Sequence, residues 1–404
     1  MPEAADDGHG PAAGTWLAGL GTVLREWGRI GITGFGGPPA HIALLRRLCV
    51  QDREWLDAAE FEDAIAACNL LPGPASTELA IFCAWRVRGR AGAVAGGLAF
   101  ILPGLIIILL LSALFLAGAP PLWVRGAGAG AGAAVAAVAA ATGWSLVPPS
   151  WKRASAREPA RFSRVRWVCY LLAGAAASAT IGPWLVFVLL GSGAVELSWR
   201  RVRRRPSAVP VIAPLFFKPL FPAVLSGGLL ASVAWVAFKV GALSFGGGFV
   251  IIPLMQADAV GRGWMTNDQF LNAVALGQIT PGPVVQTVAA VGYAAAGLPG
   301  GLLAAVVAFS PSFAFVLGGG RYFSALRKNQ AAQSFLDGAG PAAIGAIFGA
   351  AILLARVLSV GWQFAVLAGA AVLLLALRRG VVLTLLSAAA VGLIVAFAGG
   401  PLPP

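Results

Sequence analysis

Long apolar stretches constrain the fold of this chain more than any other feature of its sequence. Three of them occupy residues 104–116, 364–377 and 381–397, and none alternates apolar with polar positions. A transmembrane β-strand shows such alternation, whereas a transmembrane helix needs a run of about 20 mostly apolar residues. Of the 404 residues, 58% are hydrophobic and only 11% are charged, against about 25% charged in a soluble domain. The sequence therefore predicts an all-α polytopic membrane protein and excludes soluble, disordered and fibrous folds.

The formal net charge of +13 comes largely from two short basic runs beside apolar stretches. In a membrane protein basic loops mark the cytoplasmic side, so we expect a topology signal and no nucleic-acid partner. The four cysteines form no CxxC motif and lie apart from both histidines, so no metal site and no cofactor is predicted. The runs contain Lys152, Arg153, Arg157, Arg161, Arg164 and Arg166, then Arg200, Arg201, Arg203, Arg204 and Arg205.

The chain also contains an internal repeat. Residues 27–39 read WGRIGITGFGGPP, and residues 237–249 read AFKVGALSFGGGF. Further along, REWLDAAEF (53–61) matches RGWMTNDQF (262–270), and NLLPGP (69–74) matches QITPGP (278–283). One ancestral unit of roughly 200 residues is therefore present twice. We predict a polar N-terminal tail (1–14), a first transporter repeat (15–199), a basic cytoplasmic linker (200–218) and a second repeat (219–404).

The loop charges predict that the two repeats face opposite ways. The turn after the first Pro-Gly-Pro carries Arg86, Arg88 and Arg90, while its counterpart at 295–299 is uncharged. The next loop reverses this pattern, because residues 113–123 are uncharged and the counterpart carries three cations between 321 and 328. By the positive-inside rule the halves form an inverted repeat, an organisation common in secondary transporters.

An inverted repeat with one cytoplasmic joint needs an odd number of crossings in each half. We expect about 10 transmembrane helices and two re-entrant helical hairpins, each hairpin turning at a Pro-Gly-Pro. In the first half these are a Gly-broken span at 16–45, a hairpin at 57–86, and crossings near 91–117, 122–146, 167–182 and 184–199. In the second half they are a broken segment at 219–257, a hairpin turning at 281–283, and crossings near 300–320, 331–355, 361–377 and 381–398.

Each half thus has two places where a helix must break inside the apolar region, a glycine cluster and a Pro-Gly-Pro. Broken helices expose main-chain polar groups, and the N–H groups at a new helix N-terminus form a ready site for an anion. The alternative is that the glycines serve close packing and the prolines serve kinks. Candidate substrate-binding residues at the breaks are Phe35, Gly36, Gly37, Pro38, Asn69, Pro72, Gly73, Pro74, Phe245, Gly246, Gly247, Gly248, Gln278, Pro281, Gly282, Pro283 and Gln286.

Four ionisable residues near the breaks are further candidates. Arg29 and Lys239 occupy equivalent positions, and two cations suit a dianion, although snorkelling to the interface would explain them equally well. His41 follows the first break and serves either substrate binding or packing. Glu78 follows the first Pro-Gly-Pro and is the candidate proton-coupling group, because apolar surroundings favour a neutral carboxyl. An ion pair of Glu78 with Arg29 or Arg86 is the alternative.

These motifs together resemble the chromate ion transporter family in its long, two-domain form. The resemblance rests on GFGGPPAHIALLRR (34–47), WLDAAEF (55–61), NLLPGPASTELA (69–80), SFGGGFVIIPLM (244–255) and GQITPGPVVQT (277–287). It implies a bacterial inner-membrane protein that exports chromate, driven by the membrane potential or a proton gradient. It also implies that the matched Gly and Pro motifs form the substrate region.

The leading hypothesis is thus a secondary active transporter for chromate, a tetrahedral oxyanion, embedded in the lipid bilayer. Sulfate or another oxyanion is an alternative substrate, because main-chain N–H groups discriminate poorly between similar dianions. A passive anion channel is a second alternative. An enzyme is not expected, because the sequence has no metal-ligand spacing and no dinucleotide fingerprint. The oligomeric state stays open, a homodimer included.

Overall fold

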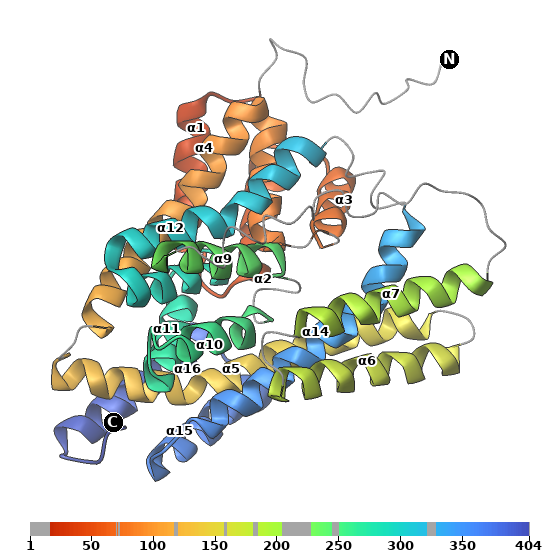
Figure 1. Cartoon of the computed structure of the whole chain (residues 1–404). Coiled ribbons are helices and arrows are strands. Elements are labelled where there is room, and N and C mark those ends of the chain that lie inside the picture. Colours follow the sequence, from red (N-terminus) through yellow and green to blue (C-terminus); the bar gives the residue numbers. More distant parts are fainter. Residues whose placement is uncertain are drawn as a thin grey trace, which may run out of the picture.

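The computed structural model describes residues 17–403, apart from Leu70, Pro72, 117–119, 157–159, 181–184, 204–227, 245–249 and 321–328. Every regular element in this part of the chain is a helix (Figure 1). The all-α fold class is therefore confirmed for the described residues. The candidate residues Pro72, Phe245, Gly246, Gly247 and Gly248 lie outside them.

The helices occur in the same order in both halves. The first half contains α1 (Leu20–Thr33), α2 (Pro38–Arg46), the π-helical η1 (Arg47–Asp52), α3 (Ala58–Cys68), α4 (Ala75–Phe115), α5 (Leu122–Ser155), α6 (Ala160–Thr180) and α7 (Leu185–Arg203). The second contains α9 (Leu229–Ala242), α10 (Ile251–Gly261), α11 (Asn267–Ile279), the 3-10 turn η3 (Val284–Gln286), α12 (Thr287–Gly319), α14 (Gln330–Arg356), α15 (Gly361–Ala371), the π-helical η5 (Val372–Ala376) and α16 (Val381–Phe397).

Helix breaks occur where the sequence predicts them. Between α1 and α2, Gly36 and Gly37 have φ of 100° and 74°, which glycine adopts without strain, and Pro38 opens α2. The two Pro-Gly-Pro segments separate α3 from α4 and α11 from η3 and α12. The broken segment predicted at 219–257 contains two helices, with α9 ending at Ala242 and α10 beginning at Ile251.

The repeat extends to the backbone dihedral angles. Helix α4 is kinked at Arg88 (φ −144°, ψ 25°) and Gly89 (φ 60°, ψ −153°). Helix α12 is kinked at Ala296 (φ −145°, ψ 28°) and Gly297 (φ 62°, ψ −155°). A φ near 60° combined with a ψ near −155° is open essentially only to glycine on steric grounds. Each kink joins the second arm of a predicted hairpin to the following predicted crossing, so these pairs form bent continuous helices rather than helices joined by loops.

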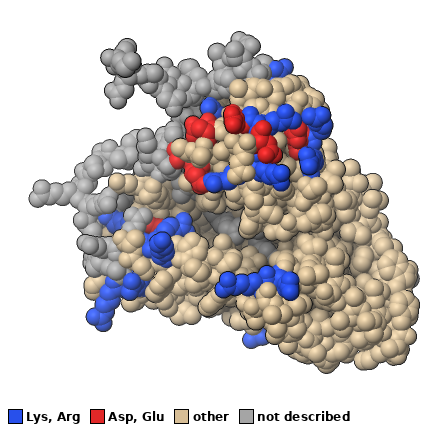
Figure 2. Space-filling model, turned by 180° about the vertical axis from the view of Figure 1, so that it is seen from behind, with Lys and Arg blue, Asp and Glu red and all other residues tan. Residues whose placement is uncertain are grey.

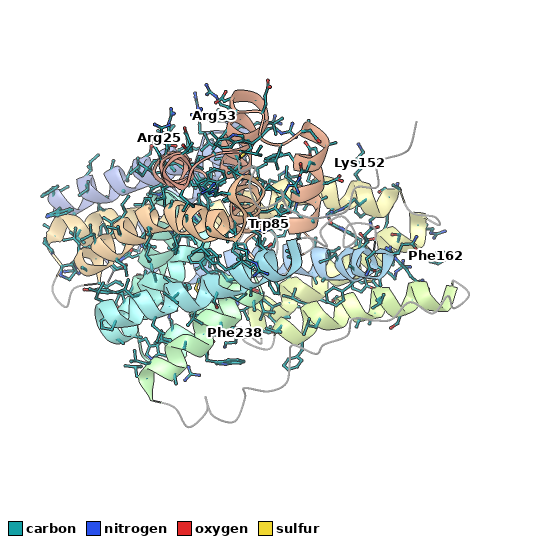
Figure 3. The ribbon with its side chains drawn as sticks, turned by 90° about the horizontal axis from the view of Figure 1, so that it is seen from above. Arg25, Arg53, Trp85, Lys152, Phe162 and Phe238 are labelled. Carbon is teal, nitrogen blue, oxygen red and sulfur yellow. The ribbon has the colours of Figure 1, made fainter. Side chains whose placement is uncertain are left out.

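The two halves interlock instead of packing as separate units. Helices α4 and α12 lie side by side, with α1 packed on α4 and α9 on α12 (Figure 3). Helices α6 and α7 of the first half pack against α14 of the second, while α15 and α16 of the second pack against α5 of the first. Glycines permit the close approach. A Cβ at Gly130 of α5 would overlap the carbonyl oxygen of Ala388 in α16, and one at Gly174 of α6 would overlap that of Ala342 in α14.

The outer surface suits a bilayer. Within the described residues four segments are long and apolar enough to cross a membrane: Ala75–Phe115, Leu122–Ser155, Val284–Gly319 and Gln330–Arg356. Shorter apolar helices are Leu229–Ala242, Ile251–Gly261, Gly361–Ala376 and Val381–Phe397. Side chains such as Leu110, Val306 and Ile394 are about two-thirds exposed or more. On the face in Figure 2 the acidic side chains gather mainly in one group bordered by basic ones, beside a broad surface without charge. The chain is therefore a multi-pass membrane protein.

Candidate functional site

The glycine break of the first half meets the Pro-Gly-Pro of the second. The main-chain N–H of Gly282 donates a hydrogen bond to the carbonyl oxygen of Gly34, with an N–O distance of 3.1 Å. Beside it, a Cβ at Gly37 would lie 3.7 Å from Cγ2 of Val284. Two of the breaks predicted from sequence, far apart along the chain, are thus neighbours in space.

His41 reinforces this junction from inside α2. The ring is fully buried, and its Nε2 lies 2.9 Å from the same Gly34 carbonyl oxygen. A carbonyl can only accept, so the hydrogen-bond network assigns the proton to Nε2. Nδ1 then accepts from the Ser76 hydroxyl at 3.3 Å. The ring also meets Phe100 edge-on, with centroids 5.0 Å apart. Both ring nitrogens are engaged within the protein, which is the geometry of the packing role.

The second Pro-Gly-Pro lies directly on α4. A Cβ at Gly104 would overlap both the carbonyl oxygen of Pro281 and the side-chain oxygen of Gln286. Gln286 donates from Nε2 to the carbonyl oxygen of Ile101 at 2.8 Å, while its Oε1 is buried without a hydrogen-bond partner. Glycine at 104 is therefore required by the close approach of another backbone.

The first Pro-Gly-Pro contacts Glu78. This carboxyl group is fully buried, and neither oxygen has a hydrogen-bond partner among the described residues. A Cβ at Gly73 would overlap Oε1 of Glu78 and would lie 3.5 Å from the hydroxyl of Ser312, on α12 of the other half. The alternative of an ion pair with Arg29 or Arg86 is wrong, because Arg86 pairs with Glu60 and Glu78 pairs with neither.

Buried polar atoms without partners concentrate at the breaks. Folded proteins satisfy nearly all such atoms, so a group of exceptions marks a place where water, an ion or a ligand could bind. Two other cases, Ser112 and Ser178, lie elsewhere on α4 and α6. Thr77, Ser244 and Ser312 were missed by sequence reasoning, although each stands next to a break or to a helix proline. The atoms near the breaks are Thr77 Oγ1, both Glu78 oxygens, Ser244 Oγ, Gln278 Nε2, Gln286 Oε1 and Ser312 Oγ.

The other candidates at the breaks vary in burial. Pro74, Pro281 and Pro283 are buried with the breaks, and Pro38 is half-buried at the start of α2. Asn69, at the end of α3, is exposed, as are Phe35 and Gly36. The buried part of the site therefore consists of main chain, Glu78 and small hydroxyl and amide groups.

The two predicted cations are not brought to the breaks. Arg29 is exposed on α1. Its counterpart Lys239 lies against α10, where Nζ pairs with Oδ2 of Asp258 and stands 5.9 Å from the Trp235 ring centre. Sequence reasoning did not single out Asp258, which is buried and also contacts Arg262, with Nε 3.4 Å from Oδ1.

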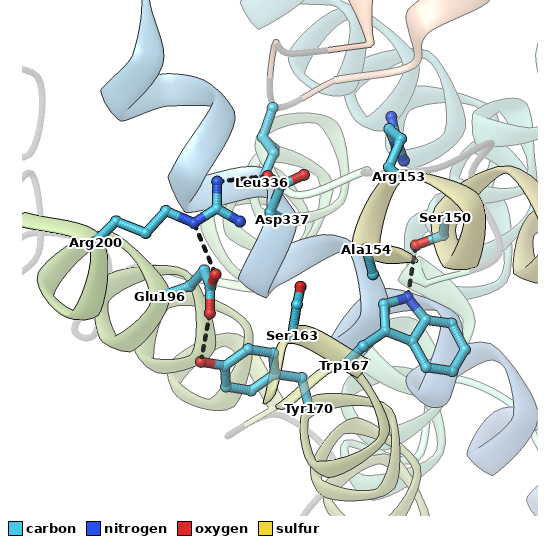
Figure 4. A pocket seen from close by; sticks show the side chains of 10 residues that line it. All are labelled: Ser150, Arg153, Ala154, Ser163, Trp167, Tyr170, Glu196, Arg200, Leu336 and Asp337. Atoms are coloured by element: carbon cyan, nitrogen blue, oxygen red, sulfur yellow. Dashed lines mark hydrogen bonds and ion pairs between the residues drawn. The ribbon is translucent and has the colours of Figure 1, made fainter. Parts of the chain in front are cut away.

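A separate polar pocket lies between the ends of α5, α6, α7 and α14 (Figure 4). Its centre is Glu196, whose side chain is 3% exposed and accepts from Arg166 at 2.7 Å, from Arg200 at 2.8 Å and from the Tyr170 hydroxyl at 3.2 Å. Arg200 also reaches Asp337 at 2.8 Å. Arg166 and Arg200 belong to the basic runs predicted as loop charges, but they are helical residues that join α6, α7 and α14.

A family model described as "Chromate transporter" matches residues 21–197 and 231–393. A "Probable chromate transport protein" of Synechococcus elongatus is 32% identical over 81% of this chain and 82% of its own. A "Chromate transport protein" of Cupriavidus metallidurans is 31% identical over 81% of this chain and 80% of its own length. A "Chromate transport protein" of Pseudomonas aeruginosa is 32% identical over 81% of this chain and 79% of its own length. No solved structure matches the chain significantly.

Proposed function

Because the chain belongs to the chromate transporter family, we propose that it is a secondary active transporter that exports chromate across the bacterial inner membrane. Three relatives that match about four-fifths of the chain are named chromate transport proteins, one of them with the qualifier "Probable". This is a family of transporters and not of enzymes. The proposed substrate is a tetrahedral dianion held at the meeting point of the helix breaks.

The observation that carries this proposal is the convergence of breaks and unpartnered polar atoms. Gly34, Gly282 and His41 join the two halves at one point, and buried hydroxyl and amide groups nearby have no partner. Broken helices are tolerated in a membrane where they are buried in protein or line a cavity, and their N-termini favour anions. The proposed site binds the oxyanion through main-chain N–H groups, with the Thr77, Ser312 and Gln278 side chains as additional donors.

We further propose that proton coupling runs through Glu78. A carboxyl group that is fully buried without partners is expected to be neutral, because an isolated charge in such surroundings is very costly. Opening of the site to water would allow it to ionise. The position of Gly73, between Glu78 and Ser312 of the other half, supports a link between carboxyl ionisation and movement of the halves.

An inverted repeat with alternating access is the proposed mechanism. The matched kinks of α4 and α12 and the reciprocal packing of α6–α7 and α15–α16 support it. The two halves differ in the hydrogen bonds of their Pro-Gly-Pro segments. The main-chain N–H of Gly282 donates to the carbonyl oxygen of Gly34, whereas that of the equivalent Gly73 donates to the carbonyl oxygen of Leu71 at 3.1 Å. Transporters built this way alternate by giving the two repeats different conformations around a fixed site.

The test is chromate uptake into inside-out vesicles that contain the protein, with and without a pH gradient, and with excess sulfate. Saturable uptake that follows the gradient is the expected result. Linear uptake that ignores the gradient would instead indicate an anion channel, and full inhibition by sulfate would widen the substrate to tetrahedral dianions in general. Uptake no greater than in empty vesicles, with folded and inserted protein, would overturn the chromate assignment.

Two variants locate the site in the same assay. Gly37 has a φ of 74° and faces Val284, so G37L is expected to abolish uptake. Gly191 of α7 has nothing within 4 Å of its Cβ position, so G191L is the matched control and is expected to transport normally. Equal uptake by both variants would remove the first break from the site.

A further inference from the structure

The two halves carry equivalent arginine–tryptophan pairs after their broken helices. Arg53 and Trp55 in the first half correspond to Arg262 and Trp264 in the second. In each pair the guanidinium lies over the indole, with 5.8 Å from Cζ to the ring centre in the first and 5.6 Å in the second. This conserved arrangement within one chain places a cation at matching positions of the repeat.

In the first half this cation is paired across the break. Nη2 of Arg53 lies 2.8 Å from Oε1 of Glu26 on α1, and Glu26 is buried. Trp27, the next residue on α1, stacks on Trp55 with ring centres 6.1 Å apart. Glu26 precedes the glycine break and Arg53 follows it, so the ion pair joins the two legs of the broken segment. We call Glu26 and Arg53 the first clamp.

In the second half a different set of residues makes the equivalent link. Lys239 on α9 precedes the second glycine cluster and pairs with Asp258 on α10, which follows it. Both side chains are 15% exposed or less. Arg262 contacts Asp258 at 3.4 Å and reaches back to the Ser232 hydroxyl of α9 at 3.4 Å. We call Lys239 and Asp258 the second clamp.

The clamps join corresponding legs of the two halves, but they use different repeat positions and have opposite polarity. In the first, the carboxylate is on the leg before the break and the cation is on the leg after it. In the second, the cation comes before and the carboxylate after. Val236 occupies the position of Glu26 in the repeat, so neither clamp is a copied residue pair. Each half has its own ionic link between the same two legs, which suggests that the link itself is what both halves need.

We propose that the first and second clamps are the two gates of the transporter, each holding its broken helix closed on one side of the membrane and released in turn. This inference rests on the proposed alternating-access function, in which an inverted repeat places equivalent positions on opposite sides of the midplane. An ion pair suits this task, because removing the two charges from water offsets much of their attraction, so the pair can hold a conformation and still part within a transport cycle.

The test neutralises one clamp at a time with R53Q and D258N. Release of one gate favours the state that is open to the side of that gate. The KM for chromate should therefore fall on that face of the membrane and rise on the opposite face. We expect shifts of about fivefold, opposite in direction for the two variants, in inside-out against right-side-out vesicles. R25Q is the control, because the Arg25 side chain is 71% exposed and its contact with Glu26 is long, at 3.4 Å. The swapped pair E26R with R53E should restore the first gate.

A second readout does not depend on transport. Hydrogen exchange of the purified protein should accelerate in α1 and α2 for R53Q, and in α9 and α10 for D258N. Exchange that changes equally in all four helices, or KM shifts that have the same sign on both faces, would overturn the gate assignment and leave a purely structural role. The exchange pattern without any chromate uptake would support the clamps while overturning chromate as the substrate.

Discussion

The main-chain N–H of Gly282 donates to the carbonyl oxygen of Gly34 across 3.1 Å, although the two residues lie 248 positions apart in the sequence. Through this bond the glycine break of the first half and the Pro-Gly-Pro of the second become one structural unit. The Gly34 carbonyl also accepts from His41 at 2.9 Å. A buried main-chain oxygen freed by a helix break is thus satisfied twice, once from each half of the chain.

Replacement of His41 by phenylalanine should weaken this junction. H41F removes the donor to Gly34 and leaves the buried Ser76 hydroxyl unpaired, which should cost about 1–3 kcal/mol of stability and most of the transport. Thermal unfolding in detergent and chromate uptake measure the two effects. S76A keeps the bond from Nε2 to Gly34, so it should lose less of both. If H41F unfolds at the wild-type temperature and transports normally, the junction is not needed.

Replacement of Glu78 by glutamine tests proton coupling. Glutamine mimics the neutral carboxyl at every pH, and no ion pair is lost, because Glu78 makes none. E78Q should therefore fold normally and bind chromate, while its uptake no longer responds to an imposed pH gradient. Glu62 pairs with Arg46 on an exposed surface, so E62Q serves as the control. Gradient-driven uptake by E78Q at the wild-type rate would assign coupling to another group.

A methyl group at Gly104 should separate the two halves. G104A places Cβ into the Pro281 carbonyl and the Gln286 side chain, and overpacking of this kind typically costs about 1–3 kcal/mol. The displaced Gln286 should also lower chromate affinity. In contrast, a Cβ at Gly28 meets nothing closer than 3.9 Å, so G28A should behave as wild type. Equal melting temperatures and affinities for the two variants would contradict the observed packing.

The Glu196 network should govern stability without affecting the substrate. E196L leaves the guanidinium groups of Arg166 and Arg200 without their shared carboxylate, although Arg200 keeps Asp337, so the protein should lose about 1–3 kcal/mol of stability. The exposed pair of Arg47 and Asp52 gives the comparison, because D52N should cost no more than about 1 kcal/mol. The measurement is thermal unfolding with and without chromate. A changed chromate affinity in surviving E196L protein would show that this pocket takes part in transport.

Local chemistry explains why sequence reasoning located the helices and their breaks. Apolar runs locate α5, α14 and α16, because hydrophobicity and length are properties of a segment alone. Single prolines such as Pro103 and Pro341 lie inside helices here, but a glycine cluster or a Pro-Gly-Pro segment breaks a helix locally, so the breaks at 34–37 and 69–74 are predictable. The sequence also singled out Glu78 as a candidate, because a lone acidic residue within an apolar helix is rare. The inverted orientation and the number of crossings stay predictions from loop charges.

What the sequence by itself determined is therefore the membrane class, the duplication and the positions of the breaks, since each depends on residues close together in the chain. Only the tertiary structure decided which groups meet. It paired Lys239 with Asp258 while leaving Arg29 exposed, joined Gly34 to Gly282, and packed each half's last helices on the other half. The physical reason is that partners are chosen by three-dimensional packing. Equivalent positions of a repeat can share a backbone yet face different side chains.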